Sequence, residues 1–142
     1  SLAGQASDYE GVFFETEFET VKEKFGKTTY QLSKAISAGE IVLTYTLPDG
    51  TTGEGTNVWL NADNGLTGWG AEDAAVCIEW FAGSTPDGLY GHTCAMPSYD
   101  DAGAYYYGDA VKAAIGKPIS VKFTIAGGDT TVNLNVTTTL AE

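Results

Sequence analysis

Apolar and polar residues alternate along much of the chain, and the alternation predicts a succession of antiparallel strands. The clearest case is residues 118–137, where every second position is apolar on both sides of Gly127-Gly128-Asp129. This spacing predicts a β-hairpin with one buried face. Its expected inward residues are Val121, Phe123, Ile125, Val132, Leu134 and Val136. Asn133 and Asn135 are then expected on the opposite, solvated face.

Residues 41–60 predict two more strands of the same kind. Ile41, Leu43, Tyr45 and Leu47 are expected to face inward, and Pro48-Asp49-Gly50 supplies a turn. After it, Val58 and Leu60 share one face of a strand. Trp59 is therefore expected to point away from the core.

The remaining segments give weaker patterns. Residues 12–19 alternate Val12, Phe14 and Phe18 with glutamates, which predicts a strand with an acidic face, and Tyr30, Leu32 and Ile36 continue the theme. Residues 74–83 carry apolar groups on both faces, so the pattern cannot orient Trp80. Residues 109–116 form the one segment expected to be helical, about two turns long and ending at Gly116.

These elements predict a single all-β domain spanning residues 1–142. Strands at this spacing favour an antiparallel β-sandwich of the jelly-roll or Ig-like kind, with at most one short helix. An apolar content of 43% suffices for one hydrophobic core in 142 residues, whereas two domains would each lack core material.

The charge balance excludes two classes of partner. Seven lysines, no arginine and nineteen acidic residues give a net charge of -12. Nucleic acid and anionic membrane surfaces are poor partners for such a chain, because both require clusters of Lys or Arg. The acidic, Thr- and Gly-rich composition is typical of a secreted bacterial protein, and the absence of an initiating Met indicates a module cut from a longer chain.

Two cysteines, Cys77 and Cys94, flank a turn-rich stretch without zinc-ligand spacing. In an oxidising compartment they could form a disulfide, and two buried thiols are the alternative. Asp63 with Asn64, and the acids at 87, 100, 101 and 109, leave open either a structural calcium or solvated turn residues, although no EF-hand spacing occurs. No other cofactor is expected.

No catalytic set stands out. The single histidine, His92, follows Gly91 in a predicted loop without a nucleophile motif beside it. Nineteen acids could in principle supply the carboxylate pair of a glycosidase, but none is distinguished. Glu79, between Ile78 and Trp80, is expected to be a rim carboxylate rather than a catalytic acid. We therefore expect no enzymatic activity.

Aromatic residues carry the strongest functional signal. Three Trp and eight Tyr exceed what a small core can bury while satisfying each N–H and O–H group. Trp59 is outward by alternation, and Trp69 lies between Gly68 and Gly70, which let the backbone bring a bulky ring to the surface. Trp80 is a weaker candidate, and the Tyr105–Tyr107 run must expose one ring, for which we choose Tyr106.

With outward Trp residues and an Asn- and Thr-rich face, the sequence resembles β-sandwich carbohydrate-binding modules of bacterial plant-cell-wall-degrading enzymes. The segments EIVLTYTLPDG, NVWLNADNG and GKPISVKFTIAGGDTTVNLNVT look like modules from rumen cellulosomal glycoside hydrolases. The resemblance spans most of the chain and rests on pattern and composition, not on a short diagnostic motif. It implies a covalently linked catalytic module and rings that hold the enzyme near β-glycans.

The sequence therefore predicts a non-catalytic module that binds β-1,4-linked plant polysaccharide such as β-glucan, xyloglucan or glucomannan. The expected ligand-binding residues are Trp59, Trp69, Trp80, Tyr106, Asn133 and Asn135. The alternative is a structural or protein-interaction β-sandwich, such as an adhesin or scaffold spacer, in which the exposed aromatic rings would anchor a protein partner.

Overall fold

A computed structural model of the chain describes residues 12–13, 15–79, 92–95, 98–99 and 101–140. Within these residues the protein is mostly β, with antiparallel sheets and three short helices. The prediction of an antiparallel, predominantly β protein is confirmed. The expectation of at most one short helix is wrong.

One four-stranded sheet contains the long C-terminal hairpin and has the strand order β10-β9-β2-β3. The hairpin register pairs Leu134 with Phe123, and β2 lies on the other side of β9 with Tyr45 opposite Phe123. Every predicted inward residue of this hairpin is buried. The strands are β2 (Val42–Thr46), β3 (Thr52–Glu54), β9 (Pro118–Gly127) and β10 (Thr130–Thr139).

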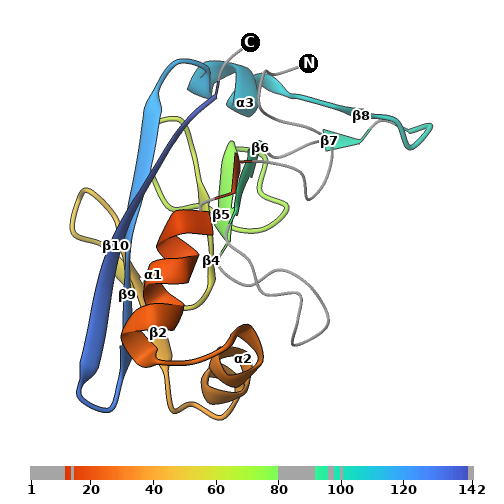
Figure 1. The fold of residues 1–142 in the computed structure, drawn as a ribbon. Helices are drawn as coiled ribbons and strands as arrows, with labels where there is room; N and C mark the ends of the chain where they lie inside the picture. The colour runs from red at the N-terminus through yellow and green to blue at the C-terminus, as the bar shows by residue number, and fades with distance from the viewer. Residues whose placement is uncertain (1–11, 14, 80–91, 96–97, 100, 141–142) are drawn as a thin grey trace.

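The second four-stranded sheet has the order β1-β6-β5-β4. All four residues of β5 are buried, in agreement with the apolar groups that the sequence places on both faces of this strand. A separate two-stranded sheet, β7 with β8, extends to one side of the molecule (Figure 1). The strands are β1 (Val12–Phe13), β4 (Asn57–Leu60), β5 (Val76–Glu79), β6 (His92–Ala95), β7 (Ser98–Tyr99) and β8 (Tyr105–Tyr106).

One hydrophobic cluster joins the two large sheets. Phe123 and Ile125 of β9 belong to the same buried cluster as Val58 of β4 and Ile78 of β5. Figure 1 shows the two sheets facing each other across this region, with β9 and β10 on one side and β4, β5 and β6 on the other. The inward faces of both sheets therefore share a single core, as the apolar content of the sequence predicted.

Residues 15–25 form helix α1 (Glu15–Phe25), so the predicted strand over 12–19 is wrong from Glu15 onward. Alternating glutamates suggested period two, but Phe18, Val21 and Phe25 also fall at helical spacing. Val21 is buried in the core, and Lys22 pairs with Glu19 one turn away at 3.0 Å. Glu and Lys favour a helix, and this preference agrees with the helical spacing of the apolar residues.

Helix α2 (Thr29–Ser37) replaces the strand expected around Tyr30, Leu32 and Ile36. Its N-terminus has a capping box, in which Gln31 N–H donates to the Thr28 hydroxyl and Thr28 N–H donates to the Gln31 side chain. Leu32 and Ala35 pack into the core while Tyr30 is exposed. The Thr-x-x-Gln spacing is the sequence signal for this helix, and the alternation of apolar and polar residues does not reveal it.

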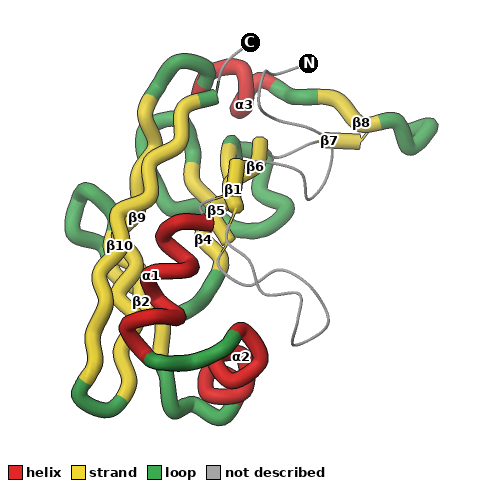
Figure 2. Tube along the Cα trace, in the orientation of Figure 1, coloured by secondary structure: helices red, strands yellow, loops and turns green. Residues whose placement is uncertain are grey.

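The predicted helix over 109–116 is confirmed as α3 (Asp109–Ala114). Gly116 follows with φ of 80°, the left-handed conformation that ends a helix readily when the residue is glycine. Figures 1 and 2 show α2 near one end of the molecule and α3 near the opposite end. Of the described helices, none is long and apolar enough to cross a bilayer.

Asp49, an exposed residue in the predicted turn after β2, adds a pH-dependent contribution to the stability of the fold. Thr51 N–H donates to Asp49 Oδ1 at 2.9 Å, and this bond, with a contribution from the Thr51 side chain, lowers the pKa of Asp49 below its ordinary 3.8. A lowered pKa means that the charged carboxylate stabilises the fold above pH 3.8 and that this contribution is lost as pH falls through the folded-state pKa. Asp49→Asn keeps an acceptor oxygen but cannot titrate.

We expect the stability difference between wild type and Asp49→Asn to be constant near neutral pH and to shrink below pH 3.8. Urea unfolding at a series of pH values measures it. An unchanged difference down to the lowest pH at which the protein folds would contradict the role of this carboxylate.

Candidate functional site

Trp69 is the most exposed large hydrophobic residue of the described chain, with 80% of its surface accessible. It occupies the second position of a turn that Ala71 N–H closes by donating to the Gly68 carbonyl at 3.0 Å. Gly70, the third residue of the turn, has φ of 79°, as a type II turn requires. The turn therefore presents the indole at a corner of the backbone, which confirms that the flanking glycines bring this ring to the surface.

The segment that leads to this turn is attached to the edge of the second sheet. Leu66 forms a bridge with Leu60, and Thr67 N–H donates to the Trp59 carbonyl at 2.9 Å. On the side of β4 away from Leu66, β4 pairs with β5, and Ala75 N–H donates to the Leu60 carbonyl at 2.8 Å. Residues 65–67 thus extend the sheet by a short strand-like segment, and Trp69 follows directly from it.

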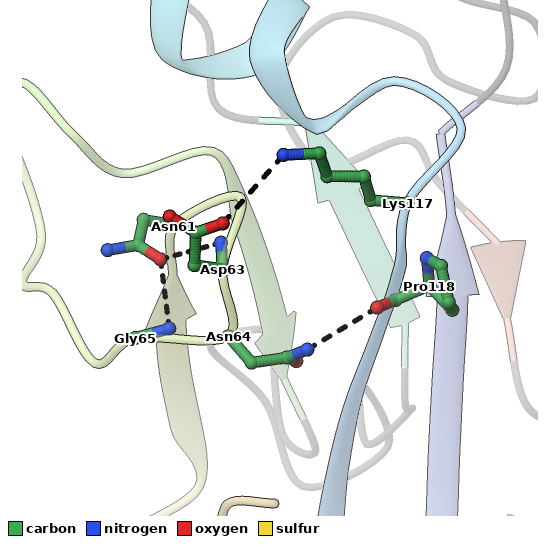
Figure 3. Close-up of polar contacts among 6 residues, drawn as sticks. All are labelled: Asn61, Asp63, Asn64, Gly65, Lys117 and Pro118. Atoms are coloured by element: carbon green, nitrogen blue, oxygen red, sulfur yellow. Dashed lines mark hydrogen bonds and ion pairs between the residues drawn. The ribbon is translucent and has the colours of Figure 1, made fainter.

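The tip of the same loop is held by two asparagines (Figure 3). Asn61 Oδ1 accepts from the N–H groups of Asp63 and Gly65, each at 2.9 Å. Asn61 N–H also donates to the Gly65 carbonyl at 2.9 Å, which closes the hairpin. Asx-turn bonds of this kind fix a tight turn without relying on burial.

Asn64 connects this tip to the first sheet. Its side-chain Oδ1 accepts from Ser120 N–H at 2.9 Å, and its Nδ2 donates to the Pro118 carbonyl at 3.4 Å. β2 pairs with β9 only from Lys122 onward, so the amide of Asn64 takes the place of the missing strand at this part of the β9 edge. Asp63 adds an ion pair with Lys117 at 3.7 Å, both side chains being largely exposed.

Trp59 and Leu66 lie next to the Trp69 turn along the same sheet edge. Val58 and Leu60 belong to the core cluster and Trp59 does not, which confirms the predicted alternation. The ring of Trp59 is only half-buried, so part of it is accessible. Leu66 is 46% exposed, and sequence reasoning missed it because a single leucine in a Gly-rich loop carries no periodic signal.

The other predicted site residues lie elsewhere. Asn133 and Asn135 are exposed on the outer face of β10, as predicted, and Asn133 Oδ1 accepts from the Thr124 hydroxyl at 2.8 Å. Tyr106 is 52% exposed on β8. Trp80 lies outside the described residues. Trp59 on β4 and Trp69 in the loop that follows β4 are therefore close in the chain, whereas the asparagines lie on β10 and Tyr106 lies on β8, as Figure 1 shows for these strands.

A third exposed aromatic residue, Tyr30, was not anticipated. It is 49% exposed, and Lys34 lies over its ring at 5.3 Å from the ring centre. The wide hollow between the end of α1 and the start of α2, about 630 Å³ in volume, includes Tyr30 and Lys27 in its lining. Because this residue was assigned to a strand face, its exposure on a helix could not be seen from alternation.

The structure also locates residues that the sequence offered for catalysis, a disulfide or metal binding. Glu79 is buried, and Asn57 Nδ2 donates to its Oε1 at 3.4 Å. Its Cα partner on β6 is His92, and the buried Cys77 has Cys94 as its Cα partner in the same ladder. Among the described residues, no group of three or more His, Cys, Asp or Glu side chains could hold a metal ion. Asn64, a candidate calcium ligand, instead bonds the β9 main chain.

The best candidate for a functional site is therefore Trp69, on a loop that is hydrogen-bonded to β4 and, through Asn64, to β9. Leu66 and Trp59 lie on the same sheet edge but on its two faces. Leu66 pairs with the buried Leu60 and shares its face, whereas Trp59 alternates with Leu60 and faces the other way. Comparison with known proteins identifies no relative: no family model, no curated protein and no solved structure matches the chain.

Proposed function

We propose that the protein is a non-catalytic carbohydrate-binding module for neutral β-1,4-linked plant polysaccharide, with Trp69 as its principal stacking residue. The observation that carries the proposal is the 80% exposure of an indole on a hydrogen-bonded turn. Leaving such a ring in water is unfavourable, by about 25 cal/mol per Å² of apolar surface that a ligand could cover. A pyranose offers a flat C–H face of matching size.

The anchoring of the loop supports a stacking role. A ring on a mobile loop must be immobilised when a ligand binds, at a cost of about 0.5–1.5 kcal/mol for the side chain and more for the backbone. Asn61 and Asn64 fix the loop before binding, and the type II turn fixes the residue itself. Preorganisation of this kind lowers the cost of binding a ligand that stacks on the ring.

Leu66 and the accessible part of Trp59 offer further apolar surface on the two faces of the same sheet edge. Loop amides and hydroxyls would bond the hydroxyls of a sugar stacked on Trp69. The net charge of -12 favours a neutral glycan over an acidic one, because uronates would be repelled.

The proposal includes the finer architecture. The two large sheets, which share one core, form a β-sandwich of the jelly-roll or Ig-like kind, the fold implied by the resemblance to carbohydrate-binding modules. On this proposal the module is secreted, and it targets a glycoside hydrolase to which it is covalently linked.

Affinity electrophoresis tests this function. The protein is run in native gels containing xyloglucan, glucomannan, mixed-linkage β-glucan or polygalacturonate, beside a non-binding protein of similar size. We expect retardation by at least one neutral β-glycan and none by polygalacturonate, with no release of reducing sugar. Mobility unchanged by every neutral glycan would contradict glycan binding, and reducing-sugar release would contradict a non-catalytic role.

The second candidate function is that of a protein-interaction or spacer domain. The observation in its favour is that Leu66, an aliphatic residue that cannot stack as a ring does, is exposed beside Trp69. Trp residues surrounded by smaller apolar groups are common hot spots of protein interfaces. Absence of retardation in every glycan gel would favour this function over the first.

A further inference from the structure

We infer that β10 is a dimerisation strand, through which two copies of the chain join their sheets edge to edge. The proposal is independent of glycan binding and concerns the first sheet, whereas Trp69 lies in the loop after β4 of the second sheet. β10 is the terminal strand of the order β10-β9-β2-β3, so one of its edges has no neighbouring strand within the described residues. Such an edge is a template for another strand.

The hydrogen bonds around β9 show which main-chain groups face this edge. Ser120 N–H and the Pro118 carbonyl bond the side chain of Asn64, so they point away from β10. Their partners in the register are Thr137 and Thr139, whose main-chain groups must then also point away from β9. By alternation, the outward-facing residues of β10 are the odd-numbered ones, Thr131, Asn133, Asn135, Thr137 and Thr139.

The exposed edge is long and carries none of the usual protections. Strand β10 has ten residues with no charged side chain, no proline and no bulge in its register with β9. Apart from the β9 ladder, no main-chain hydrogen bond of the described residues involves the outward groups of 131–137. Helix α1 contacts β10 from the core side, because Val21 shares the buried cluster with Val132 and Leu134.

The sequence of β10 identifies the occupant as a second copy. Residues 130–138 read TTVNLNVTT, which is the same in both directions about Leu134. Two such strands, antiparallel about a twofold axis at Leu134, place Asn133 opposite Asn135 of the partner copy. Every residue from Thr130 to Thr138 then meets its own residue type, so asparagine pairs with asparagine, threonine with threonine, and apolar residues with apolar residues across the twofold axis.

The main-chain geometry agrees with this register. With the twofold axis at Leu134, Asn133 pairs with Asn135 of the partner copy, and Thr131 pairs with Thr137 of the partner copy. The main-chain groups of all these residues face outward. They would exchange about eight main-chain hydrogen bonds in total. On the outer face, asparagine amides would meet each other, and threonine hydroxyls would do the same.

Burial within the hairpin also indicates an open edge. The inward residues of β9, Val121, Phe123 and Ile125, are at most 2% exposed, whereas Val132, Leu134 and Val136 of β10 retain 6–8%. A partner strand would cover this residual apolar surface. The strand is also neutral in a chain of net charge -12, so it is a place where two acidic copies can approach.

A charge exchange at the two asparagines tests the proposal. In Asn133→Lys/Asn135→Lys, each lysine would lie directly opposite a lysine of the partner copy, and Asn133→Glu/Asn135→Glu does the same with acids. We expect sedimentation velocity to show a dimer for wild type between micromolar and millimolar concentrations. Each double variant should dimerise about tenfold or more weakly, and an equimolar mixture of the two should recover the dimer as a heterodimer.

The matched control is Val42→Lys/Thr44→Lys, which adds the same charge to the same face on the inner strand β2 and should leave the dimer intact. Circular dichroism confirms that each variant is folded, and the mixture remains informative if either variant is less stable. A monomeric wild type at all concentrations, undiminished dimer in both double variants, or a mass that rises beyond two copies would overturn the proposal. The lysine variant also makes the net charge less negative, so its loss of dimer could not be attributed to overall repulsion.

Discussion

Replacing Trp69 by alanine is expected to weaken binding to the preferred glycan by about thirtyfold, or about 2 kcal/mol. A stacked sugar covers about 80 Å² of one ring face, and about 25 cal/mol is gained per Å² of apolar surface removed from water. The alanine variant loses this surface without losing the loop, because the turn is held by Gly68, Ala71 and Gly70 through main-chain geometry. Isothermal titration with the glycan that gives the strongest retardation measures the effect.

Two variants control this prediction. Trp69→Tyr keeps a smaller ring and should retain most of the binding. If Trp69 served only to pack the loop, the affinities of the variants would not follow the stacking area of the ring. Tyr106→Ala removes another exposed aromatic side chain, on β8, and should leave the affinity within about twofold of wild type. Equal affinity of wild type and Trp69→Ala would show that the ring is not the ligand platform.

The hairpin β9–β10 and the strand β4 could be predicted from the sequence because their local signals agree. Alternation, β-branched residues and a Gly-Gly-Asp turn all indicate the same inward set, and every member of that set is buried. The exposure of Trp69 was predictable for a similar reason, since flanking glycines act through the backbone alone. These features depend on residues within a few positions of each other.

Helices α1 and α2 could not be inferred by alternation because their segments satisfy two periods. In residues 15–25, glutamates at every second position imitate a strand, and the apolar residues Phe18, Val21 and Phe25 also fit a helix. The Thr28–Gln31 capping box would have resolved the assignment of Tyr30 and Leu32. Exposure of Tyr30 then follows from the helix face it occupies.

The anchoring of the site was beyond sequence reasoning. Asn64 reaches Ser120, 56 positions along the chain, and nothing local distinguishes such a contact from an Asp or Asn in a solvated turn. The same residue was a candidate calcium ligand by composition. Its bonds to β9 become visible only when the end of β2 is known, because they fill the edge that β2 leaves open.

Replacing Asn64 by alanine is therefore expected to lower the free energy of unfolding by about 2 kcal/mol, the largest stability effect we expect from this loop. About half of it comes from the lost bond to Ser120 N–H, which leaves a partly buried donor without its protein partner. The other half comes from the backbone, since Asn64 has φ of 62°, which asparagine tolerates better than alanine. Urea unfolding near neutral pH measures the change.

Asn64→Gly separates the two causes. Glycine adopts the positive φ without strain but cannot bond β9, so this variant should lose only about 1 kcal/mol. Asp63→Asn is the neighbouring control, because its ion pair with Lys117 is largely exposed and should contribute little. If Asn64→Ala and Asn64→Gly were both as stable as wild type, the bond to β9 would not hold the loop. Trp69 would then lack the preorganised support on which its role in glycan binding depends.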